Sequence, residues 1–582
     1  MKNLITLLLC FIATLQLFSQ SWQKASISDD FSMISSTISA PLADSYPKSN
    51  IQQLAGFPVA VVGNPTFKNM RGLALADINN DNISDIVFAT HNCIYAYTYQ
   101  GLLWQKSLTG TAIYPPTVGD INNDGFPEII QTTGGSSTTG RVYAFDHNGN
   151  LLSGWPVSCS NHWMICASAI SDLNEDEEKE IIVCEMASTV GKVHILKNNG
   201  TSFSSNWPVT LDGIPAVTPS IADVDNDGEK DIVVNSIKSR YIFGLDGLPK
   251  SGFPLVTEPL QKYSYQSPAI ADFDNDNTLE IIGATHGDAP QFYVMNHDGS
   301  DFGNWSITVP DSSWTYSPPT VVKIDGNWKI FMSRPIGSEA EDMLYGWDTD
   351  GNVLPNFPIV KAGGLEGFIS VADINDDNDC ELVFGSNLLD STGYGFIHAY
   401  SIDNGAQLPN YPIRPRGWTF MNGICPGDVN GDGMMELVAL SYTNSFGQTT
   451  DSVYINIYEL NVPYSYEKVL WGTYKGSNER TGFVRDMISN IPHNETVTGK
   501  ITISPNPVVD KLKISWNNSS TAKTVVRITD ITGRAIQSFD YPNLSGGEST
   551  IEIDLSAMQS GCYFAIVETA GKLSAVAKII KR

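Results

Sequence analysis

The sequence predicts an all-β protein: an eight-bladed, or alternatively seven-bladed, β-propeller followed by a small immunoglobulin-like β-sandwich. Three observations predict this fold. An acidic phrase of nine residues recurs about every 50 residues over most of the 582-residue chain. Short apolar segments with the alternation of β-strands flank each copy, and roughly the last 80 residues alternate as short strands and turns. Repeats of four short strands that need neighbours on both sides are typical of propeller blades.

The acidic phrase has the pattern D-x-[DN]-x-D-[GN]-x-x-[DE]. Seven copies begin at Asp77, Asp120, Asp172, Asp223, Asp272, Asp373 and Asp428. The interval between the fifth and sixth copies is about twice as long as the others. It holds an eighth, degraded copy at residues 318–329, in which Lys323 stands at the position of the first acid. Eight copies favour eight blades, and the degraded copy leaves seven as the alternative.

Each repeat supplies the strands of one blade. An apolar strand precedes the acidic loop and another follows it, as at residues 85–88. A third alternating strand follows, as at residues 142–145, and then an Asn-Gly or Asp-Gly turn, which is a strong hairpin signal. A fourth short strand carries an aromatic-Pro pair. Residues 55–485 therefore form the predicted propeller. A spare strand at residues 56–59 is expected to complete the last blade, whose third strand is predicted at residues 453–458.

The acidic phrase also predicts a metal-binding loop. Side-chain oxygens at positions 1, 3, 5 and 9 converge when position 6 turns sharply, as in the opening of an EF-hand loop. Hard oxygen donors without His or Cys favour Ca²⁺, so we expect up to seven structural Ca²⁺ ions. The predicted ligands are Asp77, Asn79, Asp81, Asp85, Asp120, Asn122, Asp124, Glu128, Asp172, Asn174, Asp176, Glu180, Asp223, Asp225, Asp227, Asp231, Asp272, Asp274, Asp276, Glu280, Asp373, Asn375, Asp377, Glu381, Asp428, Asn430, Asp432 and Glu436.

Position 6 of the loop requires a positive φ angle, which Gly and Asn adopt readily. Six loops have Gly or Asn there, whereas the third has Glu177, so we expect the third site to be the weakest. The alternative is a set of Asx turns that only join strands. The loops resemble the FG-GAP/VCBS class of calcium-binding propeller repeats over roughly residues 55–485. That resemblance implies the fold and the metal, and it implies no particular ligand.

The two ends of the chain predict export. Residues 1–20 have the early positive charge and apolar run of a secretory signal peptide. Residues 21–54 form a leader segment, and residues 486–500 a linker before the last domain. Residues 501–582 contain Ser504-Pro505-Asn506-Pro507, Asp530-Ile531-Thr532-Gly533-Arg534, Gly561-Cys562-Tyr563-Phe564 and a basic end.

This last domain resembles the C-terminal sorting domain of the type IX secretion system of Bacteroidetes. The resemblance implies that the type IX secretion machinery is a partner. After the signal peptide directs export to the periplasm, the resemblance implies passage across the outer membrane, then removal of the domain and either surface attachment or release. After the signal peptide no apolar run is long enough to predict a transmembrane span.

Composition restricts the partners further. The chain has 63 Asp and Glu against 35 Lys and Arg, for a formal net charge of −28. This balance excludes a nucleic-acid partner, because such a partner needs a basic surface. The predicted ligand positions hold 23 of the 63 acidic residues, so much of the negative charge belongs to predicted metal ligands. The cysteines show no CxxC pair, which argues against zinc. Cys159 and Cys166 could bridge a loop or stay free.

Linear catalytic motifs such as GxSxG, HExxH and GxxxxGK[ST] do not occur in the sequence. Aromatic residues recur just before the first strand of several repeats, where a ring would turn them to one face. The candidate ligand-binding residues are Tyr114, Trp163, Tyr265, Trp314, Tyr316 and Trp418. The alternative for these rings is packing between blades.

Three functional hypotheses follow. The leading one is a secreted or cell-surface calcium-binding propeller that binds a glycan or a protein as an adhesion-type module. The second is a polysaccharide-degrading enzyme, a lyase or hydrolase, on a propeller scaffold. The third is a structural component of a surface layer.

Overall fold

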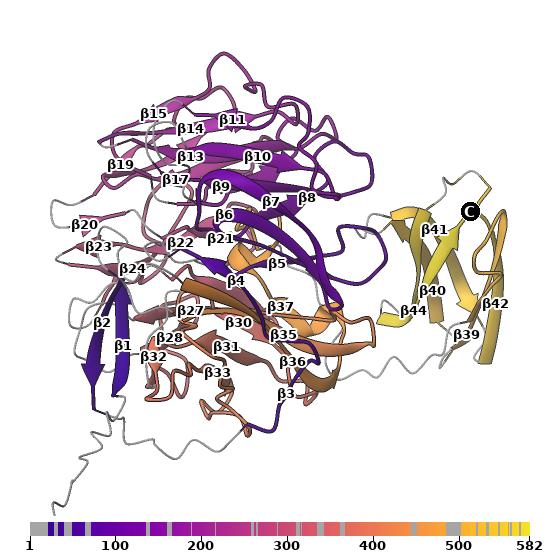
Figure 1. The fold of residues 1–582 in the computed structure, drawn as a ribbon. Coiled ribbons are helices and arrows are strands. Elements are labelled where there is room, and N and C mark those ends of the chain that lie inside the picture. Colours follow the sequence, from indigo (N-terminus) through magenta and orange to yellow (C-terminus); the bar gives the residue numbers. More distant parts are fainter. Residues whose placement is uncertain are drawn as a thin grey trace, which may run out of the picture. The chain divides into compact units, whose positions relative to one another are not determined.

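The computed structural model describes residues 21–27, 33–39, 49–64, 71–135, 140–159, 164, 166–187, 189–215, 217–257, 261–263, 266–287, 289–309, 315, 317–334, 343–360, 367–443, 451–484, 502–518, 522–530, 535–544, 547–556, 558, 561–569 and 572–582. The chain divides into two compact units, Met1–Arg485 and Asp486–Arg582. The described residues lie mostly in strands, and two short 3₁₀ helices, η2 (Tyr466–Lys468) and η3 (Tyr474–Gly476), belong to the first unit (Figure 1). The predicted signal peptide and linker lie outside the described residues.

The first unit contains one antiparallel sheet for each acidic phrase and one for the degraded copy. The first four sheets contain β5 (Ala74–Ala76), β6 (Asp85–Thr98) and β7 (Gly101–Ala112); β8 (Thr117–Gly119), β9 (Glu128–Thr133), β10 (Arg141–Phe145) and β11 (Val157–Ser158); β12 (Ala169–Ser171), β13 (Glu180–Met186), β14 (Gly191–Leu196) and β15 (Val209–Leu211); and β16 (Ser220–Ala222), β17 (Asp231–Asn235), β18 (Ser239–Phe243) and β19 (Leu255–Val256).

The next four sheets complete the series. They contain β21 (Ala269–Ala271), β22 (Glu280–Ala284), β24 (Gln291–Met295) and β25 (Ile307–Thr308); β26 (Thr320–Ile324), β27 (Asn327–Arg334), β28 (Met343–Trp347) and β29 (Ile359–Val360); β30 (Ser370–Ala372), β31 (Glu381–Gly385), β33 (Ile397–Ser401) and β37 (Val469–Trp471); and β34 (Ile424–Gly427), β35 (Met434–Tyr442), β36 (Asp451–Pro463), β4 (Val59–Gly63) and β3 (Gln52–Gln53). In the sixth sheet a tight turn at Asp325 and Gly326, both with positive φ, replaces the acidic loop.

The predicted closure by an N-terminal strand is confirmed. Val59 to Gly63 of β4 pair antiparallel with Ile455 to Asp451 of β36, in the eighth sheet. The strand begins later than predicted, because the Phe57 N–H donates to the Leu54 carbonyl oxygen in a turn (3.1 Å).

The first strands of the sheets also contact one another in cyclic order. β8 contacts β5 and β12, β16 contacts β12 and β21, and β21 contacts β26. β37 contacts both β26 and β30, and β34 contacts both β30 and β5. The first unit is therefore a closed, propeller-like ring of small antiparallel sheets.

Hydrogen bonds between side chains and backbone connect neighbouring sheets. In four sheets an indole N–H donates to a carbonyl oxygen of the following sheet, at N···O distances of 2.7–3.0 Å. The pairs are Trp104 with His147, Trp155 with Asn198, Trp207 with Leu245, and Trp305 with Thr349. In the second and third of these sheets the indole belongs to the aromatic-Pro pair of the sequence. The aromatic residue of that pair therefore connects one repeat to the next.

A segment at the end of the first unit bonds to strands from all around the ring, and we call its residues 466–484 the axial segment. Its carbonyl oxygens accept N–H bonds of 2.8–3.0 Å from four first strands. The donors and acceptors are Val118 with Asn478, Ile170 with Glu479, Ile221 with Thr481, and Ile270 with Gly482. β37 of the same segment pairs with β30. The axial segment thus lies along the first strands of at least five sheets.

Two buried basic side chains hold the axial segment in place. Lys475 Nζ donates to the Pro219 carbonyl oxygen (2.6 Å) and to Ser220 Oγ (2.7 Å). The Arg480 guanidinium, which is fully buried, donates to the carbonyl oxygens of Tyr474 (2.7 Å) and Pro116 (3.1 Å). Burial lowers the pKa of Lys475 well below its ordinary value and that of Arg480 to about 10.

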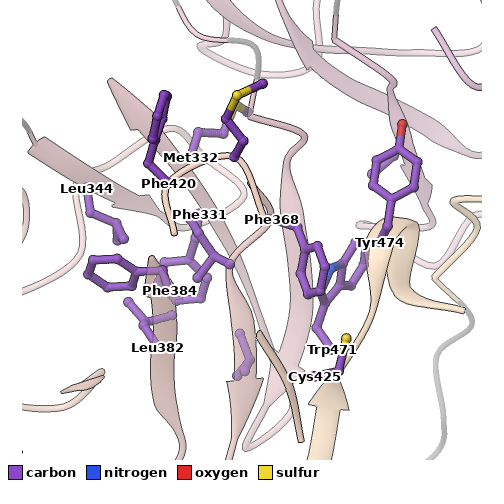
Figure 2. Packing of buried hydrophobic residues seen from close by; sticks show 14 of the residues in the cluster. Phe331, Met332, Leu344, Phe368, Leu382, Phe384, Phe420, Cys425, Trp471 and Tyr474 are labelled. Carbon is purple, nitrogen blue, oxygen red and sulfur yellow. The ribbon is translucent and has the colours of Figure 1, made fainter. Parts of the chain in front are cut away.

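The largest hydrophobic cluster joins the axial segment to the surrounding sheets. Trp471 and Tyr474 of the axial segment belong to the same buried cluster as Phe368, Phe384 and Phe420 (Figure 2). Burial of large aromatic side chains supplies much of the stabilisation in such a core. The axial segment is therefore part of the core of the ring.

Two small sheets lie beside the main series. β1 (Trp22–Ile27) pairs with β2 (Met33–Ile38) and with β32 (Leu388–Leu389), and Trp22 stacks on Phe396 at a centroid distance of 5.5 Å. Part of the predicted leader segment is therefore a hairpin on the seventh repeat. The second small sheet pairs β20 (Gln261–Lys262) with β23 (His286–Gly287).

The second unit is a β-sandwich, as predicted. Its two sheets contain β38 (Thr502–Ser504), β39 (Lys511–Asn518) and β42 (Gly547–Asp554); and β41 (Ala535–Leu544), β40 (Ala522–Asp530), β43 (Gly561–Thr569) and β44 (Lys572–Lys581). The core between them includes Leu512, Trp516 and Val526. The Ile580 N–H donates to Asn506 Oδ1 (2.7 Å), which connects the basic end to the Ser504–Pro507 motif.

Candidate metal-binding loops

The seven acidic loops all connect the first strand of a sheet to its second strand. In the first loop, for example, Asp77 directly follows β5 and Asp85 opens β6. The same placement recurs in the other six loops. Each first acid directly follows a short first strand, and the ninth residue opens the second strand in every loop except the last, where Glu436 is the third residue of β35. The structure thus brings all 28 predicted ligands into seven equivalent loops.

Three hydrogen bonds repeat in all seven loops. The N–H of position 6 donates to the carboxylate of position 1 at 2.7–3.3 Å. The N–H of position 7 donates to the carboxylate of position 5 at 2.7–3.0 Å. The N–H of position 2 donates to the carboxylate of position 9 at 2.7–3.2 Å. Backbone donors therefore orient three carboxylates of each loop.

The backbone of each loop turns at two positions. Position 6 has a positive φ angle in all seven loops, as predicted, with values from 68° at Asn82 to 93° at Gly228. Position 4 also has a positive φ in every loop, which the sequence pattern did not reveal. The third loop places glutamates at both positions, Glu175 (φ 60°) and Glu177 (φ 73°). A positive φ angle strains residues that have a Cβ atom, and Asn and Asp tolerate it better than other such residues. The third loop therefore has two strained positions instead of one, which strengthens the prediction that its site is the weakest.

The carboxylate at position 9 is buried in every loop, with at most 3% of the residue exposed. Burial, reinforced by the carboxylates at other positions of each loop, raises its pKa, while the position 2 N–H bond partly opposes the shift. The pKa rises to about 6 at Asp85, to about 7 at Glu128, Glu180, Asp231, Glu280 and Glu436, and to about 8 at Glu381. Such a group requires either a proton or a cation.

The donor set of these loops fits Ca²⁺. All predicted ligand atoms are carboxylate or amide oxygens, which are the hard donors that Ca²⁺ accepts in flexible geometry. In the fourth loop Asp223, Asp225 and Asp231 each place one oxygen within 4.8 Å of the others, and Asp272, Asp274 and Asp276 do so in the fifth. The buried position 9 carboxylate gives each loop a charge that an ion would neutralise.

The aromatic candidates do not form an exposed surface where they are described. Tyr114 is 2% exposed and Trp418 is 0% exposed. The Tyr114 ring lies 5.9 Å from the ring of Tyr474 in the axial segment. These two residues therefore pack in the core, which was the alternative for them. Trp163, Tyr265, Trp314 and Tyr316 lie outside the described residues.

Two features of the cysteines in the first unit could not be predicted from a sequence motif. Cys159 and Cys166 are free thiols rather than a bridge. Cys159 instead meets Glu185 of β13 and His194 of β14, with one ligand atom of each within 4.8 Å of the others and the His194 Nε2 atom 2.7 Å from Glu185 Oε2. Sulfur, nitrogen and oxygen donors together are a set that zinc accepts. Their irregular sequence spacing explains why the sequence pattern missed them.

Comparison with known families gives two matches. Residues 502–582 match the secretion system C-terminal sorting domain, and residues 77–131 and 172–234 match the FG-GAP-like repeat. These two segments contain the first four acidic loops. The chain therefore carries FG-GAP-like repeats in its first unit and a type IX sorting domain at its end. It is a β-propeller protein that type IX secretion delivers to the cell surface or the extracellular space. Among the described residues no helix is long and apolar enough to cross a membrane.

Comparisons with individual proteins add little. None of the curated proteins compared with the chain matches it. The biofilm matrix protein Bap1 of V. cholerae is 15% identical over 73% of this chain and 90% of its own, with a TM-score of 0.32. BBS1N, solved in complex with ARL6DN, is 11% identical over 71% of this chain and 98% of its own, with a TM-score of 0.37. Similarities this weak carry no argument about function.

Proposed function

We propose that the protein works outside the cell as a calcium-stabilised, adhesion-type binding module for an extracellular protein or glycan. The observation that supports calcium is the repetition of one loop geometry in seven sheets, each with a buried carboxylate at position 9. The residues at positions 1, 3, 5 and 9 would hold one Ca²⁺ in each loop, up to seven in all. A bound ion supplies positive charge to these carboxylates and so connects the first strand of a sheet to the second.

We place the binding surface away from the centre of the ring, because in the part of the chain that the structure describes the axial segment lies along the first strands there. The outer hairpins do offer contacts. Leu151, Leu248 and Val353 stand at the hairpin between the third and fourth strands of three sheets, and they are 47%, 65% and 50% exposed. Val256 and Val360 on fourth strands are 70% and 50% exposed. Exposed aliphatic groups that recur at these hairpins and fourth strands suit a protein surface, whereas sugar binding usually involves aromatic platforms.

The proposal is tested by binding assays with the full secreted chain. We expect retention of a surface protein from the producing cells, or of a polysaccharide, in calcium, and loss of that retention after a chelator unfolds the loops. Replacing Leu248 and Val256 with Ser should weaken binding without changing the thermal midpoint. Turnover of a polysaccharide, seen as new reducing ends or unsaturated products, would support the enzyme instead. Dense surface arrays without any ligand would support a structural layer.

A further inference from the structure

The fourth acidic loop already contains a cation from the chain itself. The Lys250 Nζ atom lies 2.9 Å from Asp225 Oδ2, 2.7 Å from Asp227 Oδ2 and 3.1 Å from Asp231 Oδ1. These carboxylates are positions 3, 5 and 9 of the loop. The Lys250 side chain is 21% exposed, and that of Asp231 is fully buried. One ammonium group therefore reaches three of the four predicted ligands.

Lys250 departs from a pattern that the other repeats share. It lies in the hairpin between β18 and β19, where its N–H donates to the Ile242 carbonyl oxygen (2.8 Å). The same backbone bond, at 2.9–3.0 Å, is made in five other sheets by a residue that is always apolar. Those residues are Leu152, Phe203, Phe302, Leu354 and Leu408. The apolar side chain of the other hairpins is thus replaced by a lysine in the fourth sheet, whereas the fifth sheet, whose loop also holds four carboxylates, has Phe302 there.

Other lysines near the loops do not make the same contacts. Lys468 Nζ lies 3.7 Å from Asp373 Oδ2 and binds Asp376, which is position 4 and no predicted ligand. Lys230 donates to the backbone carbonyl oxygen of Asp172. Among these lysines of the described residues, Lys250 alone forms ion pairs with several predicted ligands of one loop.

The ammonium group and Ca²⁺ would compete for the same oxygens. An ammonium has three N–H donors, and here Nζ donates to Asp225 and Asp227 and forms an ion pair with Asp231 at 3.1 Å. Ca²⁺ binds oxygens at about 2.3–2.6 Å, so an ion among these carboxylates would take the place of Nζ. The ammonium is also tethered to its own loop, which gives it a high effective concentration there.

We propose that Lys250 is a built-in cation that occupies the fourth loop in place of Ca²⁺, so that the chain binds six ions rather than seven. This inference rests on the proposed function, because it takes calcium in the other six loops as given. Its consequence is that the fourth sheet keeps its loop closed in the absence of calcium. The fourth sheet then provides one ordered sheet from which the ring can refold when calcium is added back.

The test counts calcium ions on the full-length wild type and on three variants. At saturating calcium, native mass spectrometry should find six ions on the wild type and seven on Lys250→Leu, which restores the apolar residue of the other hairpins. The reverse change Leu152→Lys should remove one ion from the second loop. Leu354→Lys is the matched control, because the sixth sheet has no acidic loop and its calcium count should stay at six.

A second measurement does not depend on any variant. Hydrogen exchange of the wild type should show that calcium protects residues 120–128 but leaves residues 223–231 unchanged. Calcium-dependent protection of residues 223–231, or seven ions on the wild type, would overturn the role of Lys250 alone. An equal ion count for wild type and Lys250→Leu would do the same. No bound calcium in any loop would remove the proposed function together with this inference.

Discussion

The raised pKa values at position 9 make a prediction about the metal-free protein. In a chelator, raising the pH from 5.5 to 8.0 should destabilise the first unit. Glu128 shows why: its pKa is about 7 in the fold and 4.5 ordinarily. Between these values the folded protein holds a proton that the unfolded chain has lost. Stability therefore falls as the pH rises through this window, and the decline is complete above about pH 7.

The magnitude follows from the size of the shift. One pKa unit corresponds to 1.36 kcal/mol, so a shift from 4.5 to about 7 is worth roughly 3 kcal/mol at one loop. Relaxation and water entry reduce this, and we take about 1 kcal/mol per sheet as a working value. Over the six loops other than the fourth, where Lys250 already supplies a cation, the loss reaches several kcal/mol. At roughly 2 °C per kcal/mol for a large domain, the thermal midpoint should drop by on the order of 10 °C.

The assay is a set of thermal scans by circular dichroism in EDTA and in calcium, at both pH values. Calcium should remove the decline, because an ion then takes the place of the proton. Glu128→Gln is the sharpest control: at pH 8.0 it should be more stable than the wild type in EDTA and less stable in calcium. A metal-free midpoint that stays constant or rises between pH 5.5 and 8.0 would refute the reasoning.

Three further outcomes are expected. Arg480→Met should lower the free energy of unfolding by about 2–4 kcal/mol, because it leaves buried carbonyl oxygens without their donor. Arg416→Met, at an exposed site, should change the free energy of unfolding little. Equal effects of the two changes would contradict the role of the axial segment. Trp155→Phe should cost about 1 kcal/mol in urea unfolding, since it removes only the indole bond to the next sheet, and an unchanged midpoint would show that this bond adds nothing. The thiols of Cys159 and Cys166, whose pKa values burial raises to about 12, should react with a thiol reagent only after unfolding, and a total short by two would reveal a disulfide.

Local pattern made much of the fold predictable. The acidic loops could be placed from the sequence because each one is a short stretch whose spacing sets its own turn, and Gly125 or Asn82 marks the turn directly. The closing strand β4 could be placed because its repeat lacked a fourth strand. The sandwich of the second unit followed from its alternation.

Contacts made only once could not be predicted. Arg480 and Lys475 lie in a stretch without any period, and their partners are far away in the sequence. Lys250 meets its loop only after the hairpin folds back on the sheet. Tyr114 was expected on a surface because its repeat position faces the ring centre, but the axial segment covers that centre. Periodicity reports what the repeats share and misses what a single segment adds.

The position of the axial segment near the end of the first unit has a consequence for the order in which the chain is made. This segment is the last part of the first unit to be synthesised, and the sorting domain at residues 502–582 follows after a short linker. A chain cut short anywhere within the repeats lacks both its final core residues and its export address. A proteolytic cut between residues 486 and 501, in contrast, would leave every contact of the axial segment on the propeller side. The residues that complete the ring thus precede the sorting domain that directs export. Removal of the sorting domain after export would leave the contacts of the ring intact.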